Sequence, residues 1–417
     1  MRQSQRGFIM RNPAPGIRRG GKGRPARLFL GLMSGTSADG IDVALTSVMR
    51  YRRGATGVRL EAFATYPYPA SLRTRVLAVA NAGRVRLDEL ASLDVELGEV
   101  FAEAARRLAR KAKTPLASVT AVGSHGQTVF HGPRPSKETG RRAATLQLAA
   151  PAVIAERTGC TVVADFRSAD VAAGGEGAPL SPHGHALLFR HPRRGRLILN
   201  LGGIANVSAV PPGPRGRPPS DVVAFDTGPG NMVLDALVEE LSAGATTFDR
   251  GGRAALRGTV DGRLLASLLK RPYFRRPPPK STGRETFGRA YAMRLLRSVR
   301  RRGGATEDAL ATAAALTARS IADQIERFIL AHGTYRELYL AGGGAKNRTL
   351  VGMIQEALPD LSVQPVDALG IPADALEAVI FALLAAEAVD GRPVWLPRAT
   401  GSKRPVILGT IVPAGAG

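Results

Sequence analysis

The sequence has little cysteine, few aromatic residues and no long hydrophobic run. Its single cysteine, Cys160, excludes a disulfide within the chain and suits a reducing compartment. No apolar run is long enough to cross a bilayer, and the apolar residues near the start are too few for a signal peptide. We therefore expect a cytoplasmic protein with no membrane partner.

Acidic residues are outnumbered, with 34 Asp and Glu against 58 Lys and Arg and a net charge of +24. Such a charge is typical of proteins that bind nucleic acid. The 50 arginines are spread along the chain, however, and aromatic residues, on which single strands stack, make up only 5%. Scattered arginine of this kind indicates a compositional bias, so we expect no nucleic-acid partner.

The length of 417 residues, 44% of them hydrophobic, predicts two domains that can each bury a core. We expect an N-terminal lobe at 28–190, a C-terminal lobe at 191–395, and a strand and tail at 396–417. Residues 1–27 hold eight basic residues and no acidic one, and are expected to form a disordered tail.

A glycine-rich turn opens the first lobe. The apolar run Leu28–Leu32 and the alternating run Ile41–Leu45 predict two strands, joined by the small residues Ser34–Gly40. Backbone N–H groups in such a turn can reach an anion, although the turn lacks the lysine of a P-loop. Asp39 and Asp42 follow where a carboxylate could reach a water on Mg²⁺. An ordinary hairpin turn explains the stretch equally well.

Three further glycine-rich turns follow apolar strands, at Gly202–Asn206, Asp226–Asn231 and Gly342–Gly344. The first repeats the opening hairpin about 170 residues later, which indicates a duplicated domain. The other two lead into helices, whose N-termini favour phosphate. Each turn is a weak signal by itself, but together they fit a nucleotide held between two halves. We therefore predict an α/β protein with the two-lobed, actin-like (ribonuclease H-like) fold and a nucleotide cleft between duplicated domains.

Polar side chains follow two other expected strands. His125 and Gln127 come after one of them, and Asp165 and Arg167 come after the next. Ligands bind at such strand ends in α/β sheets. The glycine-rich stretch Gly174–Leu180 follows, and its flexibility is what a loop that closes over a substrate needs. A structural Asp–Arg pair that caps the following turn is the more ordinary interpretation.

Glu377 stands near the start of a helix expected over Asp374–Val389. An acidic side chain in that position is stabilised by the helix dipole, so it can be purely structural. The alternative is that Glu377 points into the cleft.

Strings of residues along Leu28–Pro413 resemble the anhydro-N-acetylmuramic acid kinase family. The matching strings are Gly31–Asp42, Gly123–Thr128, Asp165–Arg167, Gly174–Leu180, Asn200–Asn206, Phe225–Met232, Pro277–Glu285 and Gly342–Asn347. Within them, Ala38 and Glu176 depart from the residues usual in the family.

The resemblance implies a kinase that converts 1,6-anhydro-N-acetylmuramic acid and ATP into N-acetylmuramic acid 6-phosphate and ADP, in peptidoglycan recycling. It implies that Asp165 is the base that activates a water. That water attacks C1, the anhydro bridge opens, and the freed O6 attacks the γ-phosphate. The resemblance also implies that Gly35–Asp42 binds ATP.

We predict ATP and Mg²⁺ as cofactors and leave the metal ligands unassigned. The predicted nucleotide contacts are Gly35, Thr36, Ser37, Ala38, Asp39, Gly40, Ile41, Asp42, Gly202, Gly203, Asn206, Asp226, Gly228, Gly342 and Gly343. The predicted sugar contacts are His125, Gln127, Arg167 and Glu377.

Two other functions stay open at this point. One is a kinase of the same fold that acts on another hexose or amino sugar, and the other is a non-catalytic actin-like protein that binds nucleotide. The sequence does not fix the oligomeric state, with a homodimer as one option, or the residues that hold the lactyl carboxylate.

Overall fold

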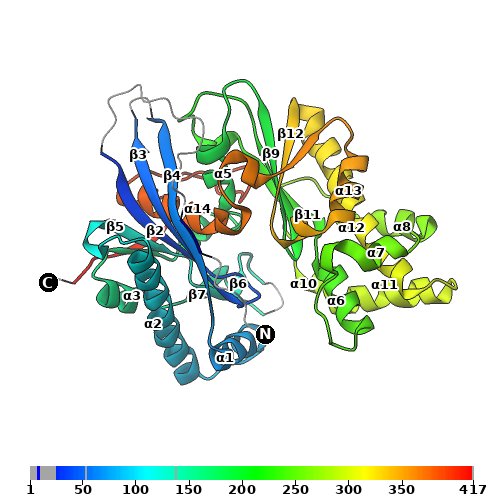
Figure 1. The fold of residues 1–417 in the computed structure, drawn as a ribbon, viewed down its shortest axis with the longest axis horizontal. Helices are drawn as coiled ribbons and strands as arrows, with labels where there is room; N and C mark the ends of the chain where they lie inside the picture. The colour runs from blue at the N-terminus through cyan, green and yellow to red at the C-terminus, as the bar shows by residue number, and fades with distance from the viewer. Residues whose placement is uncertain (1–6, 10–24, 52–53, 137–138, 416–417) are drawn as a thin grey trace. The chain divides into compact units, whose positions relative to one another are not determined.

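The computed structural model describes residues 7–9, 25–51, 54–136 and 139–415, which form two compact α/β units (Figure 1). Unit 1 takes the described residues of Met1–Leu188, Arg215–Ser220 and Gly370–Gly417, and unit 2 takes Phe189–Pro214 and Asp221–Leu369. The segment 370–395, which we expected in the C-terminal lobe, therefore belongs to unit 1. Every helix in the described residues is too short or too polar to cross a membrane.

Most of the expected N-terminal tail lies outside the described residues. The exception is Gly7–Ile9, which forms strand β1 and pairs antiparallel with Ala62–Ala64 of β4. These three residues are therefore a sheet edge and not part of a disordered tail.

Unit 1 is built on a mixed seven-stranded sheet in the order β1-β4-β3-β2-β5-β8-β14. Strands β2, β3 and β4 form an antiparallel meander, and β5 and β8 then add parallel to β2. The strands are β2 (Arg27–Met33), β3 (Gly40–Arg50), β4 (Thr56–Pro67), β5 (Val119–Ser124), β8 (Val162–Ala164) and β14 (Thr410–Val412), with the separate ribbon β6 (Gln127–Gly132) and β7 (Ala144–Leu148). The helices of this part of the chain are α1 (Ala70–Asn81), α2 (Leu87–Lys111), α3 (Pro151–Thr158), α4 (Ser168–Ala172), α5 (Ser181–Phe189) and α14 (Leu376–Val389).

Unit 2 repeats this strand order on a five-stranded sheet, β11-β10-β9-β12-β13. Strands β9, β10 and β11 form the antiparallel meander, and β12 and β13 add parallel to β9. The strands are β9 (Gly195–Leu201), β10 (Ile204–Val210), β11 (Val223–Pro229), β12 (Tyr335–Ala341) and β13 (Ser362–Pro365). The helices are α6 (Met232–Leu241), α7 (Arg253–Arg257), α8 (Gly262–Leu269), α9 (Pro272–Arg275), α10 (Arg284–Phe287), α11 (Arg289–Arg301), α12 (Thr306–Phe328) and α13 (Arg348–Ala357).

This shared order of a three-stranded meander followed by two parallel strands is the ribonuclease H-like order that an actin-like protein carries twice. The predicted fold class is confirmed in that respect. The predicted cleft between the domains stays a prediction.

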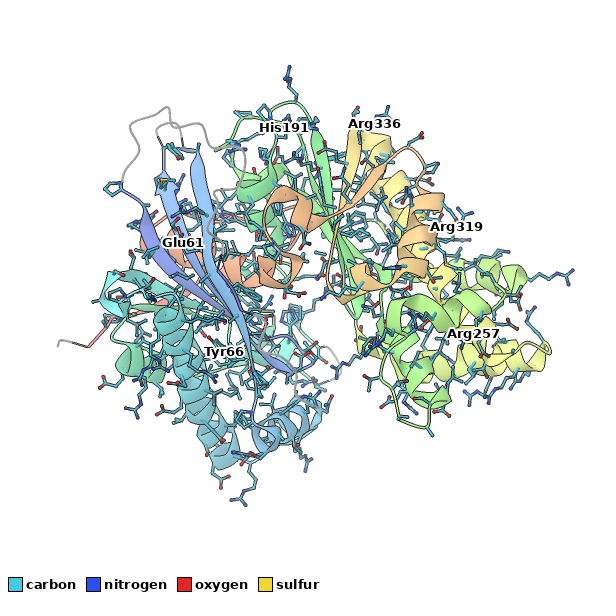
Figure 2. All side chains as sticks on the ribbon, in the orientation of Figure 1. Glu61, Tyr66, His191, Arg257, Arg319 and Arg336 are labelled. Carbon is cyan, nitrogen blue, oxygen red and sulfur yellow. The ribbon has the colours of Figure 1, made fainter. Side chains whose placement is uncertain are left out.

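The basic surface of unit 2 is scattered. Figure 2 labels Arg257 at the end of α7, Arg319 on α12 and Arg336 on β12, which are three separate elements. All three side chains are exposed.

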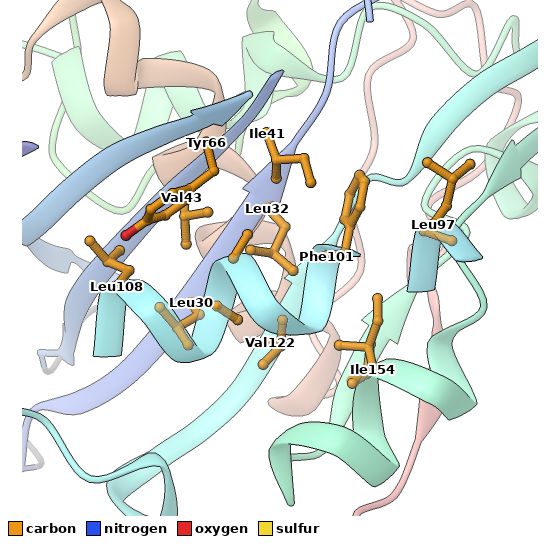
Figure 3. Packing of buried hydrophobic residues seen from close by; sticks show 14 of the residues in the cluster. Leu30, Leu32, Ile41, Val43, Tyr66, Leu97, Phe101, Leu108, Val122 and Ile154 are labelled. Atoms are coloured by element: carbon orange, nitrogen blue, oxygen red, sulfur yellow. The ribbon is translucent and has the colours of Figure 1, made fainter. Parts of the chain in front are cut away.

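Helix α2 covers one face of the unit 1 sheet through an apolar stripe. Leu97, Phe101 and Leu108 of α2 are fully buried against Leu30 and Leu32 of β2 (Figure 3). Because side chains alternate along a strand, the residue between those two leucines, Gly31, faces the opposite side of the sheet.

On that opposite face, helix α14 lies directly on the strands because glycine leaves room for its backbone. A Cβ at Gly31 would stand 1.8 Å from the carbonyl oxygen of Ala378, and one at Gly123 would stand 2.2 Å from that of Phe381. Gly31 and Gly123 are direct partners on the parallel strands β2 and β5. The pair therefore fixes how closely α14 approaches the sheet.

Replacing Gly123 with alanine should destabilise the protein, because the added methyl group meets backbone atoms that no rotamer change can move. We expect Gly123→Ala to lower the free energy of unfolding by about 1–3 kcal/mol, measured by urea denaturation. The matched control is Gly352→Ala in α13, where a Cβ meets no atom within 4 Å. That control should gain about 0.5–1 kcal/mol, as glycine does when replaced in a helix. Equal stability of the two variants would contradict the close approach of α14.

Candidate functional site

Three parallel strands of unit 1 end side by side in polar residues. Strands β2, β5 and β8 are neighbours in the sheet and run in the same direction. Ser34 follows the end of β2, His125 follows β5, and Asp165 follows β8. The sheet thus brings together residues more than a hundred positions apart, at the edge where α/β proteins bind ligands.

The turn after β2 is held in place by Gln127. The Gln127 side chain accepts from the hydroxyl of Ser34 at 2.8 Å and from that of Tyr68 at 3.3 Å, and donates to the Gly35 carbonyl at 3.1 Å. Gln127 and Ser34 are both buried. Gln127, predicted to contact the sugar, is therefore placed to support the glycine-rich turn.

The tip of this turn is presented to solvent while its base is buried. Thr36, Ser37 and Asp39 are exposed, whereas the side chains of Ala38 and Ile41 are fully buried. Ala38 has a positive φ of 48° and donates its N–H to the carbonyl of Gly35 at 3.1 Å, which closes the turn. Of the predicted nucleotide contacts in this stretch, Ala38 and Ile41 can offer only backbone atoms.

Asp42, half-buried on β3, carries an unusual carboxyl group. Burial raises its pKa to about 7, and the nearby carboxylates of Glu377, Asp39 and Asp374 add to the effect. The hydroxyl of Thr65 donates a hydrogen bond to Asp42, which lowers the pKa of this carboxyl and so opposes the effect of burial. The described residues contain no group of three or more His, Cys, Asp or Glu side chains that could hold a metal ion by themselves.

Asp165 presents an exposed carboxylate from a tightly constrained turn. Its backbone has a φ of 53°, in the left-handed region that aspartate tolerates better than most residues. Its Oδ1 accepts from the Ser168 hydroxyl at 2.6 Å and from the Ser168 N–H at 3.3 Å. The next residue, Phe166, is buried and packs its ring on that of Phe381 at 5.4 Å between centroids. The carboxylate is therefore held through one oxygen and open to solvent.

Arg167 pairs with His125 and not with Asp165, so the structural Asp–Arg pair considered from the sequence is absent from the described contacts. The Arg167 guanidinium donates from Nη2 to His125 Nε2 at 2.8 Å and from Nη1 to the Gly177 carbonyl at 2.7 Å. Because a guanidinium can only donate, Nε2 of the histidine must be the unprotonated nitrogen. The proton therefore lies on Nδ1, which donates to the carbonyl of Gly126 at 2.9 Å.

Burial sets the charge of these groups. It lowers the pKa of His125 well below the usual value, with the positive charge of Arg167 adding to the effect, so the imidazole is neutral. Burial also lowers the pKa of Arg167 to about 10, opposed by Glu377 and Asp170, so the guanidinium stays charged. Burial raises the pKa of Glu377, and the positive charge of Arg167 opposes this shift. His125, Arg167 and Glu377 thus form one electrostatic group, and their role as sugar contacts stays a prediction.

Asp170 is a site residue that sequence reasoning missed. Its buried carboxylate accepts the N–H of Gly177 at 2.7 Å and so fixes the glycine-rich loop that follows α4. A Cβ at Gly175 would stand 2.2 Å from Asp170 Oδ2, so the loop lies against this carboxylate. The sequence signal was available, since Asp170 lies within the same run as Asp165 and Arg167.

In unit 2, three glycine-rich turns meet at one edge of the sheet. Asn231 joins them: its Nδ2 donates to the Leu201 carbonyl at 2.9 Å and its N–H to the Gly202 carbonyl at 2.8 Å. A Cβ at Gly344 would stand 2.8 Å from Asn231 Oδ1. Gly203 and Gly343 are exposed. The predicted contacts Gly202, Gly203, Gly342 and Gly343 therefore form one surface of bare backbone, and Asn231 is the side chain that the prediction left out.

The remaining predicted nucleotide contacts of unit 2 are Asn206, Asp226 and Gly228. Asp226 accepts the N–H of Thr282 at 2.9 Å and donates its own N–H to the Lys280 carbonyl at 3.2 Å, which fixes the loop before α10. Asn206 is the strand partner of Asp226. Gly228 is buried, and a Cβ there would stand 2.8 Å from the ring of Phe274.

Comparison with known proteins identifies the family. The model of the family "Anhydro-N-acetylmuramic acid kinase" matches residues 27–414. A protein of that description from Caldanaerobacter subterraneus subsp. tengcongensis is 43% identical over 386 residues, which cover 92% of this chain and 96% of the relative. One from Salinibacter ruber is 43% identical over 389 residues, covering 93% and 96%, and one from Bacillus cereus is 39% identical over 386 residues, covering 91% and 98%. The chain belongs to the anhydro-N-acetylmuramic acid kinase family.

Proposed function

We propose that the protein opens 1,6-anhydro-N-acetylmuramic acid with water and phosphorylates the freed O6 with ATP, giving N-acetylmuramic acid 6-phosphate and ADP. This reaction belongs to peptidoglycan recycling. We propose that the protein is cytoplasmic and has no membrane or nucleic-acid partner. The observation that carries the proposal is the exposed Asp165 carboxylate, which follows β8 at the same sheet edge where His125 follows β5 and is hydrogen-bonded by Arg167. Whether the protein works as a homodimer stays a prediction.

Asp165 acts as the general base. Ser168 occupies Oδ1, and no described residue donates a hydrogen bond to Oδ2, so that oxygen can accept a proton from a bound water. The oxygen of this water bonds to C1 as the C1–O6 bond breaks. The electron pair stays on O6, which bonds to the γ-phosphorus as the bond to ADP breaks. The proton on Asp165 returns to solvent afterwards.

His125, Arg167 and Glu377 hold the sugar in this proposal. The neutral imidazole has its tautomer fixed by Arg167 and Gly126, and the guanidinium keeps its charge despite burial. Burial raises the pKa of the Glu377 carboxyl and the charge of Arg167 opposes this, and the carboxyl oxygens can accept hydrogen bonds from sugar hydroxyls. We assign Gln127 to holding the turn after β2.

The nucleotide is held mainly by backbone. Within unit 1 we propose the exposed turn Thr36–Asp39 as a phosphate contact. Taken by itself, unit 2 offers the glycine surface with Gly203 and Gly343 as a second candidate nucleotide contact. Phosphoryl transfer depends on positioning and on neutralising charge, and backbone N–H groups supply both. Mg²⁺ would neutralise phosphate charge when bound, with Asp39 and Asp42 accepting hydrogen bonds from its waters, because the described residues contain no complete ligand set.

The test of this function measures ADP release from ATP with the anhydro sugar and with N-acetylglucosamine in parallel. We expect turnover with the anhydro sugar only, and, in ¹⁸O-labelled water with rapid quenching, one labelled oxygen at C1 and none in the phosphate. Unlabelled product kept in the same water for the same time measures exchange at C1. Phosphorylation of N-acetylglucosamine at a comparable rate would instead support a general amino-sugar kinase.

Asp165→Asn should abolish turnover while leaving nucleotide binding intact, because an amide cannot accept the proton of the attacking water. We expect kcat to fall by about a thousandfold, as for the loss of a general base. The dissociation constant of ATP, measured by calorimetry, should stay within about twofold of wild type. Asp88→Asn on the exposed start of α2 is the matched control and should change neither value. Retained turnover in Asp165→Asn would remove this residue from its role.

Gly342→Ala should weaken ATP binding selectively. Gly342 has a φ of 78°, and a Cβ there would stand 2.4 Å from Asn200 Oδ1 and 2.9 Å from the carbonyl carbon of Leu201. We expect the KM for ATP to rise by about tenfold and that for the sugar to stay unchanged. Gly303→Ala controls for backbone strain, because Gly303 has a φ of 79° with no atom within 4 Å of a Cβ. Equal KM values for ATP in the two variants would exclude the packed glycine surface as the nucleotide site.

A further inference from the structure

The segment Trp395–Lys403, which we name the strap, follows α14 and returns to the glycine-rich loop of unit 1. Sequence reasoning placed most of it in a C-terminal strand and tail. The strap is folded on itself, since the N–H of Thr400 donates to the Leu396 carbonyl at 2.9 Å and the Trp395 indole N–H donates to the Ser402 carbonyl at 3.1 Å. The strap therefore has a defined conformation that its own hydrogen bonds hold.

The strap is joined to the loop by two backbone hydrogen bonds. The N–H of Glu176 donates to the carbonyl of Thr400 at 2.8 Å, and the N–H of Lys403 donates to the carbonyl of Ala173 at 3.0 Å. These bonds run in opposite directions and bracket the glycines between Ala173 and Glu176. The strap is therefore attached to the loop on both sides of Gly174 and Gly175.

A buried side-chain bond adds to this attachment. The hydroxyl of Thr400 donates to Asp170 Oδ1 at 2.8 Å, while Asp170 Oδ2 accepts the N–H of Gly177 at 2.7 Å. Thr400 and Asp170 are 1% and 3% exposed, so neither can exchange its partner for water. Burial raises the pKa of Asp170, and hydrogen bonds from Thr400, Gly177 and the buried Ser402 oppose this effect. Removing the Thr400 hydroxyl takes away one of these donors at a place that water does not reach.

From Asp170 the contacts lead on to the proposed sugar site. Gly177, held by its N–H, offers its carbonyl to Arg167 Nη1 at 2.7 Å, and Arg167 in turn contacts His125 at 2.8 Å. A shift of the loop at Gly177 therefore changes the orientation of the guanidinium. Thr400 reaches Arg167 through two intervening residues.

We propose that Thr400 is a positioning residue for the sugar: through Asp170 and Gly177 it fixes the loop that orients Arg167 and His125. The inference rests on the proposed function for the identity of the ligand, but the order of the loop is a property of the protein alone. The printed hydrogen bonds of Thr400 go to the strap, to Asp170 and to Glu176 of the loop, and none goes to the turns proposed for the nucleotide, so we expect its effect on ATP to be small.

The experiment compares Thr400→Val, which keeps the shape and removes the hydroxyl, with Thr400→Ser, which keeps the hydroxyl. The matched control is Thr46→Val, because Thr46 is a fully buried threonine of β3 whose hydroxyl has no hydrogen-bond partner among the described residues. Thr400→Ala replaces Thr400→Val if the latter does not fold. Steady-state kinetics gives KM for 1,6-anhydro-N-acetylmuramic acid and for ATP, and amide hydrogen exchange of the ligand-free protein reports the order of the loop.

In Thr400→Val we expect KM for the sugar to rise by about tenfold and KM for ATP to stay within about twofold. The amides of Gly175, Glu176 and Gly177 should exchange about tenfold faster, while those of β3 are unchanged. Thr400→Ser and Thr46→Val should match the wild type in every value. The single tryptophan, Trp395, lies in the strap, so its fluorescence gives a second report on the same segment.

The outcomes separate the two proposals. Wild-type protein that does not act on the anhydro sugar overturns the proposed function, and the exchange of the loop amides then decides whether Thr400 orders the loop. Unchanged exchange in Thr400→Val overturns the inference, even if the wild type is active. Faster exchange with an equal rise of KM for sugar and for ATP also overturns it, because Thr400 would then act on the whole unit.

Discussion

The contact that unit 1 depends on is the close approach of helix α14 to strands β2 and β5 across Gly31 and Gly123. Phe381 stands on that helix, and its ring packs against His125 at 4.7 Å and against Phe166 at 5.4 Å between centroids. The helix that the glycines admit is thus also the surface on which the site is assembled. The same packing that stabilises the core sets the position of the turn that holds Asp165.

Above this apolar support, the polar groups of the site satisfy one another. His125 accepts from Arg167, Arg167 donates to Gly177, and Gly177 donates to Asp170. A buried polar group without a partner costs free energy, so each member of such a chain fixes the next. The arrangement leaves Asp165, held only through Oδ1, as the exposed carboxylate of the group.

Local features of the site could be predicted from the sequence, and long-range ones could not. The glycine-rich turns and the strand-end residues His125 and Asp165 are local, because they depend on residue types next to one another. The roles of Gln127 and Arg167 depend on which neighbour each side chain meets, and spacing along the chain does not give that. The bond between Thr400 and Asp170 joins residues 230 positions apart and leaves no local signal. The fold class was predictable because the alternating strands and the repeated hairpin carry it, whereas the return of 370–395 to unit 1 depends on the two glycines that admit α14.

The division of the chain has a consequence for how the protein is made. Unit 2 is continuous in sequence except for the inserted Arg215–Ser220, which belongs to unit 1. The sheet of unit 1 receives its edge strand β14 and its helix α14 from residues that follow unit 2 in the sequence. During synthesis from the N-terminus, all of unit 2 emerges from the ribosome while unit 1 still lacks the helix that covers one face of its sheet. Unit 1 therefore completes its folding only after unit 2 has been synthesised, and until then its half-built sheet exposes the apolar surface on which chaperones act.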